Sequence, residues 1–87
     1  MVSFKIEWRS STKKDLRKIQ PQQVIRILEA VNSLCKDPRP SNSCKLSGSE
    51  RTYRLRVGDY RVIYEIFEDR IVIEVLKVRH RKEAYRA

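Results

Sequence analysis

Three arginines lie close together in the segment 52–64, within two short runs rich in apolar residues. They are Arg54, Arg56 and Arg61. A guanidinium group stays charged at any accessible pH and donates two aligned hydrogen bonds, which suits a phosphate group. Several guanidinium groups around one phosphate would also stabilise the extra negative charge of a phosphoryl-transfer transition state. This segment therefore predicts a binding site for a polyanion, with chemistry that would suit phosphodiester cleavage.

The same segment indicates a β-hairpin, because Gly58-Asp59 separates two runs of alternating polar and apolar residues. A two-residue loop there places Arg56 directly opposite Arg61 and brings all three arginines onto one face of the sheet, the arginine face. The other face receives the apolar residues Tyr53, Leu55, Val57, Tyr60, Val62 and Tyr64. Like charges directly opposite one another destabilise a sheet, so we expect an anion to bind on the arginine face.

A second group of polar residues follows the last apolar run, namely His80, Arg81, Lys82 and Tyr85. Strand alternation after a two-residue loop at Glu68-Asp69 brings His80 to the arginine face, and one further helical turn returns Arg81 and Tyr85 toward it. An imidazole and a phenol can each accept or donate a proton. The set suits RNA cleavage by the RNA's own 2′-hydroxyl, which needs a base, charge stabilisation and an acid. Tyr85 could instead stack on a base of single-stranded RNA.

Each of these residues also has a plain structural interpretation. Arg54 and Arg56 could form the solvated side of a strand, His80 could be structural, and Tyr85 could pack the C-terminal tail against the domain. Composition and spacing alone indicate a basic nucleic-acid-binding α+β domain and go no further.

The elements that must position these side chains follow from apolar periodicity. Residues 2–8 alternate and predict a first strand, and Thr12 with Asp15 forms a capping-box-like pair that predicts the start of a short helix. A second helix is expected from Pro21, with six residues on one apolar stripe. These are Val24, Ile27, Leu28, Val31, Leu34 and Cys35.

Residues 36–51 are polar, lack periodicity and predict a loop, with Lys45 beside the arginine face. Residues 60–67 and 70–79 predict the last two strands. The two-residue loop between them would place Ile66 opposite Ile71 and Arg61 opposite Leu76. Ile71, Ile73 and Val75 would then join the apolar face.

The expected order is therefore β-α-α-β-β-β, an α+β fold with two N-terminal helices packed on one face of a mainly antiparallel sheet. The arginine face would also carry several apolar residues. These are Ile63, Phe67, Val72, Leu76 and Val78. So much apolar surface on an open face predicts that a protein partner covers part of it.

The chain has 87 residues, which predicts a single domain spanning residues 1–87. Twenty Lys and Arg residues against 11 Asp and Glu residues give a net charge of +9, which favours a polyanionic partner. No apolar run approaches the roughly 20 residues of a membrane helix. Cys35, Cys44 and His80 lack the spacing of metal ligands, so we expect no metal, no cofactor, and a reduced cytoplasmic protein.

The chain resembles the RelE/ParE superfamily of bacterial and archaeal toxins from type II toxin–antitoxin pairs. The resemblance covers essentially the whole chain and is carried by the order and spacing of four segments. These are Lys45-Leu46-Ser47-Gly48, Tyr53-Arg54-Leu55-Arg56, Tyr60-Arg61-Val62-Ile63-Tyr64 and His80-Arg81-Lys82-Glu83-Ala84-Tyr85-Arg86. It implies a microbial RNase-like fold and neutralisation by a small antitoxin encoded beside the toxin. On the RelE branch it also implies ribosome-dependent cleavage of mRNA in the A site, with inhibition of translation.

The resemblance also implies roles for individual residues. Arg54 and Arg56 occupy positions where the family places basic residues on the second strand, and Arg61 matches the arginine that binds the scissile phosphate. Arg81 matches the arginine that acts as acid or stabilises the leaving group, and Tyr85 matches the tyrosine that contacts substrate. Lys45, His80 and Lys82 are expected to add RNA contacts.

The chain departs from some relatives, which carry lysines at the second-strand positions. A lysine there can lose its proton and act as a base, whereas an arginine in practice cannot. The base role is therefore left to Tyr85, His80 or ribosomal RNA. Two other functions stay open: a ParE-like inhibitor of DNA gyrase, and a non-catalytic module that binds RNA or antitoxin. The expected antitoxin is acidic and partly disordered.

Overall fold

The predicted order of helices and strands is confirmed by the computed structural model, which describes residues 3–84 and the side chains of residues 3–82. The strands are β1 (Lys5–Trp8), β2 (Ser43–Lys45), β3 (Thr52–Val57), β4 (Tyr60–Phe67) and β5 (Val72–His80), and the helices are α1 (Ser10–Arg17), α2 (Pro21–Ser33) and α3 (Arg81–Ala84). The helical turn expected after the last strand is α3, whereas β2 was not predicted, because three residues are too few to show periodicity.

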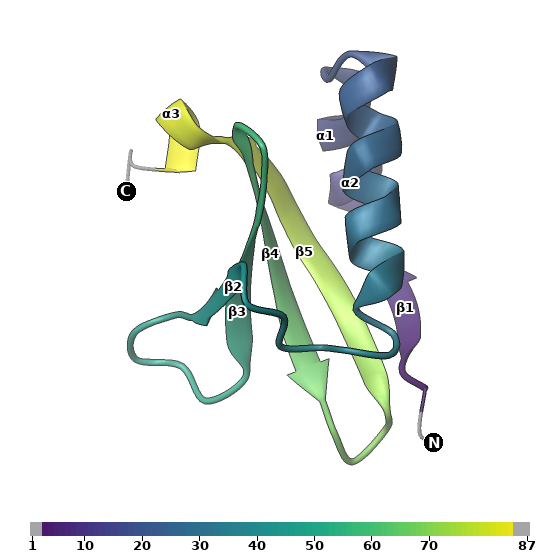
Figure 1. Cartoon of the computed structure of the whole chain (residues 1–87), viewed down its shortest axis with the longest axis vertical. Coiled ribbons are helices and arrows are strands. Elements are labelled where there is room, and N and C mark those ends of the chain that lie inside the picture. Colours follow the sequence, from purple (N-terminus) through teal and green to yellow (C-terminus); the bar gives the residue numbers. More distant parts are fainter. Residues whose placement is uncertain (1–2, 85–87) are drawn as a thin grey trace.

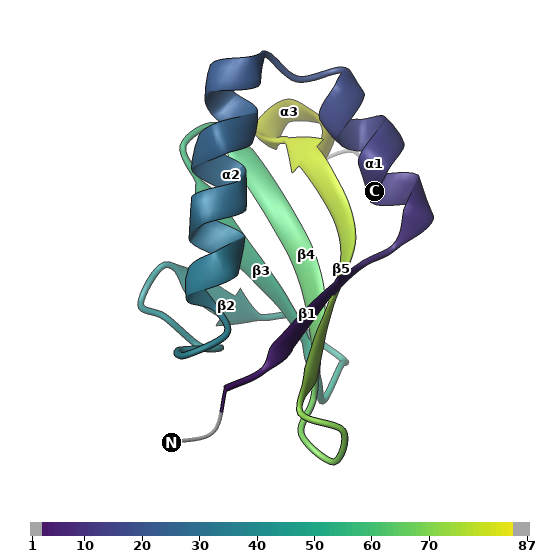
Figure 2. The same cartoon turned by 90° about the vertical axis from the view of Figure 1, so that its right-hand side faces the viewer.

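The five strands form one sheet in the order β1-β5-β4-β3-β2. β1 runs parallel to β5, and the other neighbours are antiparallel. Figure 1 shows the sheet between α2 on one side and α3 with the chain around β2 on the other. Figure 2 looks onto the side covered by α1 and α2, which we call the helix face. The sheet thus has one covered face and one open face, as the sequence predicted.

The core lies between the helix face and α2. Ile27, Val31 and Leu34 of the predicted apolar stripe are fully buried, whereas Leu28 remains 37% exposed at the margin of that stripe. They pack with seven buried sheet residues: Leu55, Val62, Tyr64, Ile66, Ile73, Val75 and Val78. Burial of a large aliphatic side chain stabilises a fold by about 1.5–3 kcal/mol, so this cluster holds the helices on the sheet.

The β3–β4 hairpin has the predicted register. Arg56 pairs with Arg61 and Val57 with Tyr60 across the Gly58-Asp59 turn. Gly58 has a φ of 58°, and Asp59 is not among the residues with positive φ, which is the pattern of a type II′ turn. The turn therefore follows from local chemistry, and it brings the arginines onto one face.

The β4–β5 register differs from the prediction. The connection spans residues 68–71 rather than two residues, so Ile66 pairs with Ile73 and not with Ile71. Ile71 has a φ of 55° and is 41% exposed, outside the apolar core where it was expected. A left-handed conformation suits a turn and not a strand, which explains why β5 begins after it.

A β-bulge between Ile63 and Tyr64 shifts the register by one more residue. Arg61 consequently lies opposite Arg79 instead of Leu76, and Val62 lies opposite Val78. Val78 was expected on the arginine face but is only 2% exposed in the core. An extra residue in one strand reverses the face that every later side chain occupies, and here it buries an apolar one.

The predicted capping box of α1 is wrong. The helix begins at Ser10, and Arg9 holds the N-cap position without a side-chain hydrogen bond to the helix. Thr12 is buried and donates its hydroxyl to the carbonyl of Arg9. The Asp15 carboxylate accepts the N–H of Val78 on β5 instead of a cap N–H, so it joins α1 to the sheet.

Candidate anion-binding site on the arginine face

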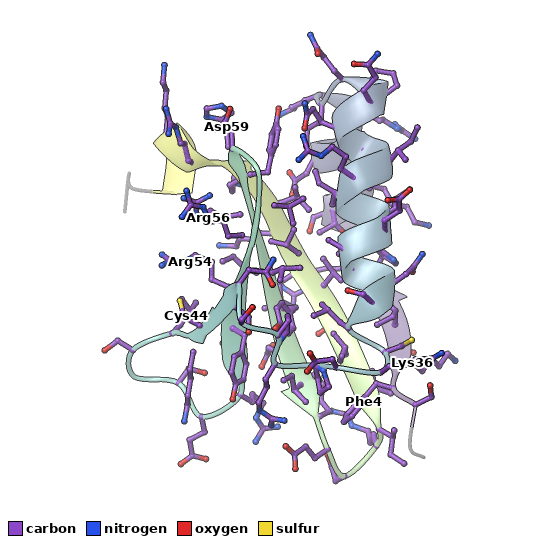
Figure 3. The ribbon with its side chains drawn as sticks, in the orientation of Figure 1. Phe4, Lys36, Cys44, Arg54, Arg56 and Asp59 are labelled. Carbon is purple, nitrogen blue, oxygen red and sulfur yellow. The ribbon has the colours of Figure 1, made fainter. Side chains whose placement is uncertain are left out.

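Two neighbouring strands bring the three predicted arginines together. Arg54 and Arg56 extend from β3 and Arg61 from β4, and with the segment before β3 they line a cavity of about 300 Å³. The full lining is Ser41, Asn42, Ser43, Cys44, Arg54, Arg56 and Arg61. Figure 3 shows Arg54, Arg56 and Cys44 pointing away from α2, on the open side of the sheet. The cavity is polar and strongly basic.

Arg61 is the most unusual of these side chains, because it is only 7% exposed. Its Nη1 donates a hydrogen bond to the carbonyl oxygen of Tyr60 at 3.2 Å. Among residues 3–82, no ion pair joins Arg61 to an acidic side chain. Burying a charge without a counter-charge is costly, so natural proteins pair such charges or bind a ligand beside them. Arg61 is buried, lines a cavity and has no acidic partner among residues 3–82, so it is a candidate anion-binding residue.

The rest of the cavity lining, the segment 41–44, is held in place by hydrogen bonds that the sequence did not reveal. Asn42 donates its side-chain amide to the carbonyl of Arg56 at 2.8 Å, and its own carbonyl accepts the Arg56 N–H at 3.0 Å. Cys44 pairs with Arg54 in the β2–β3 ladder, and Nη2 of Arg54 lies 3.5 Å from its Sγ. The segment 41–44 is thereby fixed against β3, which gives the cavity its depth.

An aromatic cluster on the other side of β3 anchors the chain that leads to this segment. Tyr64 is fully buried, donates its hydroxyl to the carbonyl of Pro38 at 2.7 Å and stacks on Tyr53 at 5.9 Å. Burial raises the pKa of the Tyr64 phenol above its ordinary value. Arg39 donates to the Tyr53 hydroxyl and to Glu68, and these hydrogen bonds, the Tyr53 one foremost, raise its pKa. The loop after α2 is therefore bound to the sheet before it reaches the cavity.

Arg79 was not singled out from the sequence, because the bulge concealed its position. It pairs with Arg61, which itself pairs with Arg56, so three arginines form a row across β3, β4 and β5. Its guanidinium group is bound to the Asp15 carboxylate of α1 at 2.7 Å. Arg79 is thus an adjacent positive charge that has an acidic partner, in contrast to Arg61.

His80 was expected on the arginine face, and that expectation is wrong. It pairs with Tyr60 on the helix face, and the two rings meet edge to face at 5.3 Å. It lines a separate cavity of about 280 Å³ with Asp15, Lys18, Ile19, Tyr60, Val78 and Arg79. Its Nδ1 accepts the N–H of Lys82 at 3.3 Å. The cause is again the bulge, which reverses the face of every residue that follows it in β5.

Lys45 was also expected beside the arginines. It lies in β2 opposite Tyr53, whose side chain packs against the core, so the register assigns Lys45 to the face opposite Arg54. The position next to the arginines belongs to Cys44 instead. Without the β2 strand, the sequence offered no basis for the side on which each of these residues lies.

Arg81 contacts the turn of the β3–β4 hairpin and does not line the arginine cavity. Arg81 begins α3, its N–H donates to the carbonyl of Asp59 at 2.7 Å, and its Nε lies 3.9 Å from an Asp59 carboxylate oxygen. Lys82 is exposed. Neither side chain lines the arginine cavity. Tyr85, predicted to contact substrate, lies outside the described residues.

Within the described part of the chain, residues 3–84, no group of three or more His, Cys, Asp and Glu side chains could hold a metal ion. A helix long and apolar enough to cross a membrane is likewise not found there. The arginines of this face are cationic hydrogen-bond donors, which can bind an anion.

Comparison with known proteins identifies relatives of the whole chain. The family described as "ParE toxin of type II toxin-antitoxin system, parDE" matches residues 6–85. The RelE1 protein of Methanocaldococcus jannaschii is 30% identical over 88 residues, covering 98% of each chain. The archaeal RelE–RelB complex from Pyrococcus horikoshii contains a chain of similar structure, with a TM-score of 0.82, 31% identity, and coverage of 91% of this chain and 96% of that one.

A third similar protein is in the RelBE2 toxin–antitoxin complex from Mycobacterium tuberculosis. Its TM-score is 0.79 at 25% identity, and the match covers 91% of this chain and 99% of that chain. The predicted superfamily resemblance and the predicted RelE-like α+β fold are both confirmed by these comparisons.

Proposed function

We propose that this chain is a ribosome-dependent endonuclease that cleaves mRNA in the A site and thereby inhibits translation. The chain belongs to the RelE/ParE superfamily of toxins from type II toxin–antitoxin systems. One observation carries the proposal. Arg61 is only 7% exposed in a cavity with Arg54 and Arg56, and it has no acidic partner among residues 3–82. A phosphodiester supplies the missing negative charge.

The proposed reaction uses the 2′-hydroxyl of the RNA as nucleophile. Its oxygen attacks the adjacent phosphorus, the bond from phosphorus to the 5′-oxygen breaks, and a 2′,3′-cyclic phosphate and a free 5′-hydroxyl result. Arg61 binds the scissile phosphate, and Arg54 and Arg56 stabilise the negative charge that increases at the transition state. Each such preorganised donor is worth about 2.7–4 kcal/mol in transition-state stabilisation.

Proton transfer must come from outside this arginine set, since a guanidinium does not lose its proton in a protein. The imidazole of His80 lies on the opposite face against Tyr60, which removes the reason for assigning it the base role. We assign that role to Tyr85 or to a ribosomal RNA group. We assign stabilisation of the leaving 5′-oxygen to Arg81, whose helix α3 stands on the open side of the sheet (Figure 1).

The partners that we propose are a cognate antitoxin, the ribosome and mRNA, all in the cytoplasm. Relatives from Pyrococcus horikoshii and Mycobacterium tuberculosis have been solved as complexes with their antitoxins. A net charge of +9 favours an acidic antitoxin that covers the arginine face. The expected apolar patch is smaller than the sequence suggested. Val78 is in the core, and Phe67 lies against the guanidinium groups of Arg51 and Arg70, whose carbon atoms are 5.4 and 4.3 Å from the ring centre.

The experiment is to add the protein to translating ribosomes and map the 5′ ends of the mRNA. We expect codon-phased cuts that fall at least about 100-fold in Arg61→Gln, in line with loss of one oxyanion donor, and that are lost in Arg81→Ala and Tyr85→Phe. Arg70→Gln, which removes an arginine outside the cavity, is the matched control and should cut at the wild-type rate. Free RNA should be cut little, because the ribosome must align the substrate.

The match to the ParE toxin family supports a second candidate, inhibition of DNA gyrase. A supercoiling assay with purified gyrase separates the two functions. Intact mRNA together with blocked supercoiling would replace the first proposal by the second. Binding of RNA or antitoxin without either effect would instead identify a non-catalytic module.

A further inference from the structure

The arginine cavity contains a nucleophile that the proposed reaction does not use. Cys44 is an exposed free thiol that lines the cavity, and its Sγ lies 3.5 Å from Nη2 of Arg54. Figure 3 shows its sulfur on the same side of the sheet as Arg54 and Arg56. The other cysteine, Cys35, lies just past the C-cap residue of α2, is partly buried, and does not line this cavity. The chain therefore has one thiol within a basic cavity and one outside it.

A second observation indicates what kind of molecule enters the cavity. Arg61 is 7% exposed, lines the same space, and has no carboxylate partner within residues 3–82. A buried guanidinium in that state favours an anion beside it. Clustered positive charge in a concave site also concentrates anions and raises their association rates by about 10- to 1,000-fold. An anionic reagent thus meets Cys44 more often than a neutral one of similar size.

We propose that Cys44 is a modification site for small disulfides that carry carboxylate groups, and that the resulting mixed disulfide closes the arginine cavity. The Cys44 thiol gives its proton to solvent, and the thiolate attacks one sulfur of the disulfide. The bond between the two reagent sulfurs breaks, one half leaves as a thiolate, and the other half stays on Cys44. No further oxidant is required, because the reagent disulfide is itself reduced.

The adduct would block the site in two ways. Its carboxylate pairs with the arginines that would otherwise hold a phosphate, and its bulk occupies a cavity of only about 300 Å³. This consequence rests on the proposed function, because it is the binding of RNA phosphate that the adduct prevents. A thiol reductant removes the adduct and reopens the cavity, which makes the modification a reversible control of the toxin.

The test compares two reagents on the Cys35→Ser variant. The chain has two cysteines, so this variant has Cys44 as its single thiol. The dianionic reagent is 5,5′-dithiobis(2-nitrobenzoate), and the neutral reagent is 4,4′-dithiodipyridine. For each thiol, the rate constant of the anionic reagent is divided by that of the neutral reagent. The ratio for Cys44 is then divided by the ratio for the free thiol N-acetylcysteinamide, and this quotient measures how strongly the cavity attracts the anionic reagent. We expect this quotient to be about 10 or more at low salt, and to fall toward 1 in Arg54→Gln and in 0.5 M NaCl.

Arg26→Gln, which removes an exposed arginine of α2 outside the cavity, is the matched control and should leave the quotient high. If Cys35→Ser does not fold, wild-type protein with the adduct located by mass spectrometry gives the same comparison. A quotient near 1, or an adduct formed faster on Cys35 than on Cys44, would overturn the proposal.

The effect on function is read from the same protein. The anionic adduct should abolish ribosome-dependent cleavage, dithiothreitol should restore it, and the reagent should cause no further change in Cys44→Ser. Retained cleavage by fully modified protein would refute closure of the cavity. If unmodified protein cuts no mRNA, the proposed function fails, and the rate quotient alone still decides whether Cys44 is the modification site.

Discussion

Replacing Arg61 by methionine should make the protein more stable while removing its activity. Arg61 is 7% exposed and lies directly opposite Arg56, and no acidic side chain among residues 3–82 compensates its charge. Methionine retains much of the apolar stem that packs on the sheet but carries no charge. The substitution therefore removes an unfavourable electrostatic contribution without leaving a large cavity.

The magnitude follows from two contributions. Relief of the cross-strand repulsion with Arg56 is worth about 0.2–1 kcal/mol. Relief of the desolvation of a poorly paired polar group adds about 1–3 kcal/mol, of which the loss of the Tyr60 carbonyl hydrogen bond cancels about 1 kcal/mol. We expect a net increase of about 0.2–3 kcal/mol in the free energy of unfolding. For a chain of this size, 1 kcal/mol corresponds to a rise of about 4–8 °C in Tm.

The measurement is urea unfolding at low ionic strength and without polyvalent anions, where a small domain is expected to unfold in two states. Arg56→Gln is the control. It also relieves the repulsion between Arg56 and Arg61, but the Arg56 side chain is exposed, so any other change in the free energy of unfolding should be less than about 0.5 kcal/mol. Adding phosphate should stabilise wild type and leave Arg61→Met unchanged. Destabilisation of Arg61→Met by more than 1 kcal/mol, with no phosphate effect on wild type, would show that Arg61 is a structural residue.

Two further substitutions test what positions the site. Asp15→Asn should lower the free energy of unfolding by about 1–3 kcal/mol, because it removes the charge that holds Arg79 and weakens the acceptor of the Val78 N–H. The control is Glu7→Gln, at an exposed ion pair, which should lower it by less than about 0.5 kcal/mol in the same assay. Tyr64→Phe should cost about 1 kcal/mol through its lost hydrogen bond. Because burial raises the Tyr64 pKa, the neutral phenol stabilises the fold fully below its unfolded pKa of about 10, and this contribution is lost as pH rises through the higher folded pKa. Stability measured from pH 9 upward should therefore decline less in Tyr64→Phe than in wild type, and an equal decline would contradict this account.

The hairpin that carries the arginines could be predicted because its determinants are local. Gly58 supports the positive φ of a two-residue turn, and strand alternation then places Arg54, Arg56 and Arg61 on one face. The apolar stripe of α2 could be predicted for the same reason, since an α-helix has 3.6 residues per turn whatever packs against it. The same local patterns carried the superfamily resemblance.

The position of His80 could not be predicted in this way. Its face depends on the length of the 68–71 connection and on a bulge at Ile63 and Tyr64. In the observed register Val78 is buried in the core and Ile71 is exposed, which the local sequence did not reveal. A single inserted residue reverses the face of everything beyond it, so an error of one position moved His80 to the wrong side and hid Arg79.

The sequence by itself determined that this is a basic α+β domain with a hairpin that gathers three arginines, because turns, periodicity and charge are properties of neighbouring residues. Tertiary structure decided which further groups meet them. Pairing of β2 with β3 set Cys44 beside Arg54, and the packing of α1 on β5 set Asp15 against Arg79. Only the fold could show that Arg61 is buried without an acidic partner in the described residues, because burial depends on distant parts of the chain.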